Sequence, residues 1–149
     1  MTRDDGELQD AVRSAVAQVG IRSAVLFVLR PGSFVLELAA AAGIDGPALE
    51  GLTAAVRNPD HPISRTIVDE ATTYDVRPTA PGGPALRSHL PLVASHAGRR
   101  TVVSVLAVAH QDRLTPETRR VLAVLADTAA ASLDPTDEPG DGTTEPLRR

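Results

Sequence analysis

Histidine and serine side chains are the residues of this sequence with the most potential for chemistry at neutral pH. Ser64 and the Ser88-His89 pair lack the Gly-x-Ser-x-Gly turn that exposes the nucleophile of a hydrolase. No two histidines have the spacing that places two metal ligands on one helix face or close together on one strand. We therefore predict no catalytic residue and no metal site. The four histidines are His61, His89, His96 and His110.

The sequence contains no cysteine. This excludes thiolate nucleophiles, thiol redox chemistry, iron–sulfur clusters, the usual structural zinc sites and disulfides. The Gly82-Gly83 pair lies between prolines and not at the start of a helix, so it does not predict a phosphate-binding loop. We expect no cofactor.

Length and composition favour one globular domain. The chain has 149 residues, of which 42% are hydrophobic, and a formal net charge of −4, which argues against nucleic-acid binding. All basic residues are arginine, and with the abundance of alanine we interpret this as an effect of coding composition. No apolar run is long enough to cross a bilayer, and the first residues are polar and acidic. We therefore expect a cytoplasmic protein that does not bind membranes.

The spacing of apolar residues predicts helices at both ends of the chain. Residues 7–19 carry an apolar stripe that Gly20 ends, and Thr115-Pro116-Glu117 has the composition of a helix start. Between them, Asp45-Gly46-Pro47 opens a short helix that Pro59 closes, and His61-Pro62 opens one or two further turns. We place a tail at 1–6, one domain at 7–134 and a disordered acidic tail at 135–149.

Runs of β-branched and apolar residues predict the strands between these helices. Leu106 and Val108 lie in the most strand-like of these runs, so we expect both in the core. Proline and glycine between positions 77 and 86 indicate a loop. The predicted strands are 23–29, 34–39, 72–76, 88–93 and 101–110.

The order of these elements, together with particular residues, resembles the GAF domain family. The resemblance covers about Leu8 to Leu133 and rests on several fragments taken together. They are His61-Pro62-Ile63-Ser64-Arg65-Thr66-Ile67-Val68, Leu90-Pro91-Leu92 with Gly98 beyond it, Val103-Ser104-Val105-Leu106-Ala107-Val108, and Leu114 with Leu122 to Ala131.

The resemblance implies an α+β fold with a central antiparallel sheet of five to six strands. Terminal helices would cover one face, and a helical crossover the other. Ser104 stands where GAF sequences usually have glycine, and the Asn-Lys-Phe-Asp-Glu type motif of cyclic-nucleotide-binding members is missing. Bilin attachment and free methionine sulfoxide reduction use cysteine in this family and are excluded. A PAS domain has a similar architecture, but the first helix and the Leu-Pro-Leu strand fit GAF better.

One cluster of polar residues is a candidate ligand site. In a GAF-like fold the segment 59–86 covers the ligand-binding face of the sheet, where a guanidinium, imidazoles and a phenol would suit a small anion or a planar ring. Arg65 and Tyr74 would face each other across a cavity, although Arg65 could also be a solvated helix residue and Tyr74 ordinary core. The candidates are His61, Arg65, Tyr74, Arg87 and His89.

We expect a non-catalytic sensory or regulatory module that forms a homodimer through its terminal helices. A small-molecule ligand and a signalling protein are possible partners. The terminal helices have more small residues than one helix face needs to cover a sheet. We expect the additional small residues to let helices of two copies pack closely. The alternatives are a structural interaction module without a ligand and, more remotely, an unrecognised enzyme. The small residues are Ala11, Ala15, Ala126, Ala129, Ala130 and Ala131.

Overall fold

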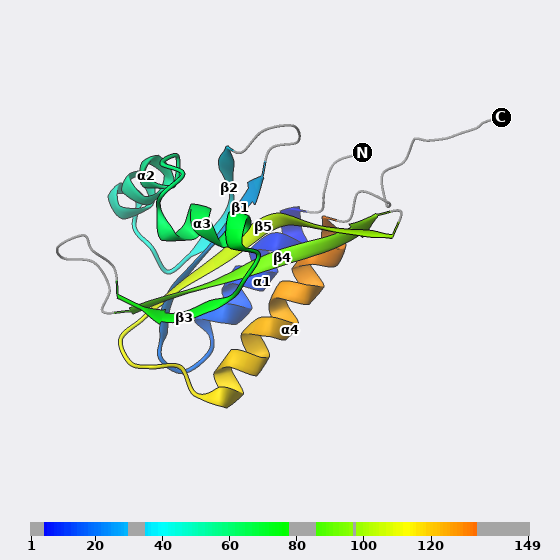
Figure 1. Cartoon of the computed structure of the whole chain (residues 1–149). Helices are drawn as coiled ribbons and strands as arrows, with labels where there is room; N and C mark the ends of the chain where they lie inside the picture. The colour runs from blue at the N-terminus through cyan, green and yellow to red at the C-terminus, as the bar shows by residue number, and fades with distance from the viewer. Residues whose placement is uncertain (1–4, 30–34, 78–85, 97, 134–149) are drawn as a thin grey trace.

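Two apolar strands, β1 (Ile21–Leu29) and β5 (Arg99–His110), lie side by side at the centre of a five-stranded sheet. The computed structural model describes residues 5–29, 35–77, 86–96 and 98–133. All the pairings are antiparallel, which confirms the predicted α+β class and sheet (Figure 1). The sheet order is β2 (Leu36–Ala42), β1, β5, β4 (Leu86–His96) and β3 (Thr73–Val76).

Alternating side chains of the strands build two cores, one on each face of the sheet. On β5, Leu106 and Val108 point toward one core, and Val105 and Ala107 toward the other. Leu106 is 1% exposed and Val108 is fully buried, as predicted. The two cores explain why both central strands are apolar at nearly every position.

The terminal helices α1 (Asp5–Val16) and α4 (Pro116–Ser132) cover the first of these faces (Figure 1). They also contact each other, and the alanines on their facing sides are buried within the chain. These are Ala11, Ala15, Ala126, Ala129 and Ala130, so the small residues behind the dimer expectation are mostly used for packing inside one molecule.

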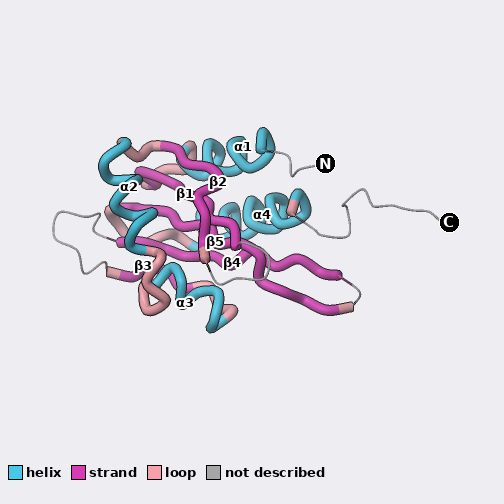
Figure 2. The backbone as a smooth tube through the Cα atoms, turned by 90° about the horizontal axis from the view of Figure 1, so that it is seen from above, coloured by secondary structure: helices cyan, strands magenta, loops and turns pink. Residues whose placement is uncertain are grey.

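The crossover helices α2 (Gly46–Ala55) and α3 (Pro62–Asp69) lie over the opposite face (Figure 2). Ile63 of α3 and Val56 after α2 pack with Val105 and Phe27 of the sheet. Both helices begin as predicted. The Asp45 carboxylate accepts a hydrogen bond from the Ala48 amide, and each helix has a proline in its first turn, Pro47 in α2 and Pro62 in α3.

Element boundaries differ from the predicted ones in a few places. The first helix ends at Val16, and Val19 is 93% exposed instead of completing the apolar stripe. Strand β2 runs on to Ala42 and ends at Gly43, which has a φ of 75° and a backbone so close to Arg22 that a Cβ would clash. The β4–β5 hairpin is also longer than predicted because pairing continues to His96 and Arg99.

Some sequence predictions fall on residues outside the described part of the chain. They are Phe34, most of the loop after Arg77, and the acidic segment 135–149. Among the described helices, none is long and apolar enough to cross a membrane.

Candidate functional site

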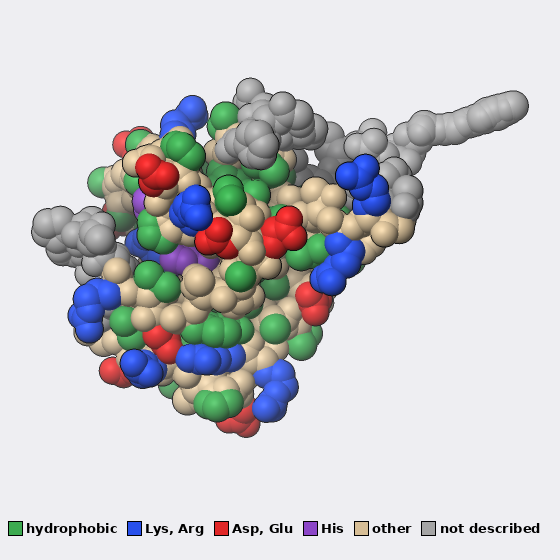
Figure 3. Space-filling view, viewed as in Figure 1, with side chains coloured by type: hydrophobic (Ala, Val, Ile, Leu, Met, Phe, Trp, Pro, Cys, Tyr) green, Lys and Arg blue, Asp and Glu red, His purple; other side chains and the backbone are tan. Residues whose placement is uncertain are grey.

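The fold brings His61, Arg87 and His89 together on the face that the crossover covers. Arg87 and His89 are two residues apart on β4, and both point away from the core under α4 because Ser88 and Leu90 point into it. His61 precedes α3, which packs on β4 and β5. Histidine side chains reach the surface where the crossover helices meet the sheet (Figure 3). Three of the five predicted ligand residues thus form one cluster.

His89 is the buried centre of this cluster. It is 1% exposed, and its Nδ1 lies 3.0 Å from the Thr73 hydroxyl of β3. Its Nε2 is buried and has no hydrogen-bond partner among the described groups. Burial, and to a smaller extent the charges of Arg87, His61 and His110, lower the pKa of His89 to about 3, so the ring is neutral at pH 7. An unpartnered buried nitrogen is uncommon in proteins and calls for an explanation.

His61 begins α3 and is partly exposed. Its Nδ1 accepts a hydrogen bond from the Ile63 amide at 3.1 Å, so the proton of the neutral ring is on Nε2. Burial and the positive charge of Arg87 lower the pKa of His61. His61 is therefore a neutral hydrogen-bond donor at its free nitrogen, and it also holds the start of the crossover helix.

Arg87 supplies the positive charge of the cluster. It is only partly exposed, and burial lowers its pKa, although an arginine stays protonated in proteins. Among the described residues, no carboxylate pairs with its guanidinium. The imidazoles of His61 and His89 are neutral, so the Arg87 guanidinium is the one positive charge of the cluster. It has no counter-charge among the described residues.

The structure separates Arg65 and Tyr74 from this cluster and from each other. Arg65 is exposed on α3 and forms an ion pair with Asp69 at 3.2 Å, one helical turn away. Tyr74 packs with the core under α1 and α4, on the opposite face of the sheet. The expectation that they face each other across a cavity is therefore wrong. For Arg65 the sequence indicated this outcome, because a residue two positions from both Ile63 and Ile67 points away from the helix face that they share.

A second polar cluster, which the sequence did not reveal, joins β3 to the start of α4. The Asp75 carboxylate accepts hydrogen bonds from the Leu114 amide at 3.0 Å and from Arg119 at 2.7 Å. The Arg119 guanidinium also lies 4.2 Å from the centre of the Tyr74 ring. Burial alone would raise the pKa of Asp75, but the bonds from Leu114 and Arg119 and the nearby charges outweigh it and lower the pKa.

Ser88 and His110 complete this second cluster. The Ser88 hydroxyl lies 2.9 Å from His110 Nε2 and accepts a bond from the Asp75 amide, and His110 Nδ1 donates to the Asp112 carbonyl at 2.7 Å. In the sequence Ser88 stands next to His89, whereas in the structure its partner is His110. Both side chains are fully buried, so no substrate reaches the hydroxyl. This serine–histidine pair is structural.

The fourth histidine, His96, lies apart from both clusters at the end of β4, beside the hairpin turn. The described residues contain no group of three or more histidine, cysteine, aspartate or glutamate side chains that could hold a metal ion.

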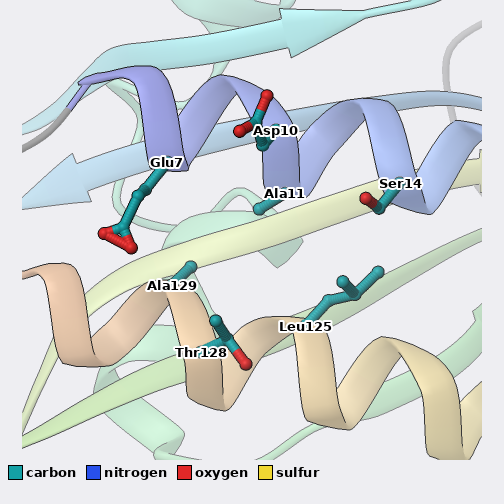
Figure 4. Close-up of a pocket in the computed structure, with 7 residues that line it drawn as sticks. All are labelled: Glu7, Asp10, Ala11, Ser14, Leu125, Thr128 and Ala129. Carbon is teal, nitrogen blue, oxygen red and sulfur yellow. The ribbon is translucent and has the colours of Figure 1, made fainter.

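A shallow groove of about 230 Å³ lies between the two terminal helices (Figure 4). Ala11 of α1 and Ala129 of α4 point into the space between the helices, and Glu7 and Thr128 also line the groove. On α4 two exposed valines form an apolar stripe one helical turn from the lining residues Leu125 and Thr128: Val121 is 36% and Val124 58% exposed. The remaining lining residues are Asp10, Ser14 and Leu125.

Comparison with known proteins identifies the fold. No family model and no curated protein matches the sequence. Among solved structures, the GAF domain region of a putative membrane protein from Geobacter sulfurreducens superposes with a TM-score of 0.66 at 16% identity, covering 87% of this chain and 91% of that one. The GAF-B domain of DevS from Mycobacterium smegmatis gives 0.65 at 20% identity, covering 87% and 92%.

A type II free methionine-R-sulfoxide reductase from Thermoplasma acidophilum is also similar, with a TM-score of 0.63 at 14% identity over 87% of this chain and 91% of that one. Most of the similar structures are GAF domains, so this chain has a GAF-like fold, as its sequence predicted.

Proposed function

We propose that this chain is a non-catalytic sensory or regulatory module that binds a small molecule at His61, Arg87 and His89. One observation carries the proposal: His89 Nε2 is buried on the crossover face without a partner among the described groups. Leaving such a group unpaired costs about 1–3 kcal/mol. A ligand atom bonded to it would remove that cost, and the partly exposed Arg87 and His61 would contact the same ligand from the solvent side.

The fold supports the general class of the proposal. GAF-fold neighbours include DevS, and a sensory or regulatory role fits them. The reductase neighbour is an enzyme, but the cysteine that this chemistry uses in GAF proteins is absent here. The buried Ser88–His110 pair offers no accessible nucleophile. Cytoplasmic location and a signalling protein partner stay predictions.

Native mass spectrometry of the protein purified from its own host tests the ligand. We expect the natural protein to retain a small molecule and the His89→Leu variant to lose it, with Arg65→Gln as a control that leaves it bound. Arg65 is a suitable control because it lies on α3 but outside the cluster. Equal masses for the natural protein and His89→Leu would contradict the site.

The homodimer is part of the same proposal, but its basis is now the exposed stripe on α4. Two copies that pack this stripe and the adjoining groove together would bury Val121 and Val124, which face solvent in the single chain. Without a ligand, this surface alone would make the chain a structural interaction module, which is the second candidate function.

Sedimentation of matched variants tests the dimer. Val124→Asp should shift the protein to a monomer without lowering its melting temperature much. Val68→Asp is the control, because Val68 is 60% exposed on α3, away from the terminal helices. A natural protein that sediments as a monomer at tens of micromolar would contradict the dimer.

A further inference from the structure

We infer that the ligand of the His61–Arg87–His89 site is a small molecule with one carboxylate, which Arg87 binds, and with a polar group beside it that bonds to His89. This inference rests on the proposed function and adds the chemical class of the ligand. It follows from the charge, the hydrogen-bonding state and the surroundings of the three side chains.

The charge argument starts from the arginines. Arg119 is paired with Asp75, Arg65 with Asp69 and Arg13 with Asp10. Arg87 is less exposed than Arg65 and Arg13, yet it has no acidic partner in the described part of the chain. A half-buried charge without a counter-charge is costly, and a bound anion would compensate it.

The two histidines limit the charge of that anion. His61 uses Nδ1 to accept the Ile63 amide and is a neutral donor at Nε2, and His89 is buried as a neutral ring. The site therefore offers one positive charge, which one carboxylate balances. A phosphate dianion would leave a negative charge in a largely covered site, so we assign the monoanion. The planar guanidinium also matches the two oxygens of a carboxylate.

The surroundings define the rest of the ligand. His89 Nε2 lacks a partner, so an oxo or hydroxyl group next to the carboxylate would bond to it. Ile63 and Ala107 belong to the apolar core on this face. Ala107 lies opposite His89 in the β4–β5 pairing, so the ligand's remaining atoms would meet apolar side chains. Short 2-oxo and 2-hydroxy acids have this combination of groups.

Acids and their neutral amides provide the test. The full chain, labelled with ¹⁵N at histidine, is titrated with acetate, lactate and pyruvate, then with acetamide, lactamide and pyruvamide, and with inorganic phosphate. Ring-nitrogen shifts of His89 and His61 and the melting temperature are followed. Arg87→Gln is the test variant and Arg65→Gln the control, because Arg65 is exposed and paired with Asp69.

We expect lactate and pyruvate to shift the His89 Nε2 resonance and raise the melting temperature, with acetate weaker. The amides should bind at least about tenfold more weakly, and Arg87→Gln should weaken acid binding about 10- to 100-fold. Arg65→Gln should change nothing. No response to any acid, or tighter binding of phosphate, would overturn the carboxylate assignment.

The same titration separates failure of the class from failure of the site. Amides that shift His89 as strongly as the acids would overturn the carboxylate and leave the proposed ligand site in place. A ligand retained in native mass spectrometry and lost in His89→Leu, but carrying no carboxylate, would do the same. If no acid or amide shifts His89 and no mass is retained, both proposals fail.

Discussion

The two faces of the sheet each hold a polar cluster, and the two clusters differ in how their charges and hydrogen bonds are satisfied. Under α4, Asp75 neutralises Arg119, and Ser88 and His110 bond to each other and to backbone groups. Under the crossover, Arg87 has no described counter-charge and His89 has a free nitrogen. Arg119 Nε also lacks a bond, but its guanidinium is held by Asp75 and Tyr74.

This difference separates a structural cluster from a candidate binding site. Polar groups buried for stability are satisfied within the chain, because an unpaired one lowers stability. Buried polar groups without a partner in the chain are expected at sites where a ligand binds. Substitutions and acid should therefore change the free energy of unfolding by different amounts in the two clusters.

Acid should destabilise the protein through His89. Its folded pKa is about 3, against about 6.5 unfolded, so above pH 6.5 both states are neutral and the ring contributes no pH dependence. Below pH 6.5 the unfolded chain takes up a proton that the folded one does not. The free energy of unfolding should therefore fall by up to about 1.4 kcal/mol per pH unit from about pH 6 to pH 4.

Urea unfolding at several pH values measures this effect. The His89→Leu variant should show a flatter profile over the same range, with the remaining slope due to His61, whose pKa is also lowered. Asp75, whose pKa is lowered, should act only in stronger acid, as pH falls below its ordinary value of 3.8. Identical profiles for the two proteins would contradict the burial of His89 as a neutral ring.

Removing Asp75 should break the cluster under α4. Its side chain is 8% exposed and accepts bonds from Leu114 and Arg119, so Asp75→Ala should lower the free energy of unfolding by about 2–4 kcal/mol. Asp69→Ala is the matched control, because it removes the exposed partner of Arg65 and should cost about 0–1 kcal/mol. Equal costs would show that the buried carboxylate contributes no more than an exposed one.

The two buried histidines should respond differently to replacement by leucine. His110→Leu removes the partner of the Asp112 carbonyl and one of the two partners of the Ser88 hydroxyl, which keeps the Asp75 amide, and should cost about 1–3 kcal/mol in urea unfolding. His89→Leu removes one bond to Thr73 but also the unpaired nitrogen, so it should cost less than about 1 kcal/mol. The reverse order would remove the distinction between the clusters.

Arg87→Met should have the smallest effect. Without an ion pair to lose among the described residues, the variant should unfold within about 0.5 kcal/mol of the natural protein or be slightly more stable. Arg119→Met is the comparison and should be clearly destabilising, because it leaves Asp75 buried without its cation. A large loss for Arg87→Met would indicate a structural role for Arg87.

The sequence predicted the fold well because periodicity and caps act locally. The stripe of α1, the Thr115 and Asp45 caps and the β-branched run of β5 each specify their element within a few residues. Three residues of the candidate site were among those predicted. Alternation along β4 places Arg87 and His89 on one face of the sheet, and His61 is the N-cap of α3, which packs beside them.

Helical spacing from the buried Ile63 is enough to place Arg65 outside the cluster, but Tyr74 and the second cluster depended on packing that no local pattern carries. Tyr74 turned to the opposite face, and its neighbour Asp75 has a left-handed φ of 58°, in a strand with only two register pairs. The cavity prediction relied on the resemblance to the GAF fold, which places segment 59–86 over the sheet but does not say which face of β3 each side chain takes; Thr73 faces the crossover, so its neighbour Tyr74 faces the other way. Asp75 and Arg119, 44 positions apart, meet only through the tertiary fold.

The two edge strands of the sheet, β2 and β3, are places where a second copy of the chain could add a strand. At one edge, the Gln9 side-chain amide of α1 donates a hydrogen bond to the Ala41 carbonyl of β2 at 2.9 Å. The β1–β2 pairing there is also irregular, because its register shifts between Leu26 and Phe27. At the other edge, β3 has four residues, and its backbone is broken at Asp75. A strand added along β2 would lose the Gln9 bond to Ala41, and one added along β3 would meet a short strand with a left-handed residue, so strand addition at these two strands, a usual route to aggregation, is disfavoured.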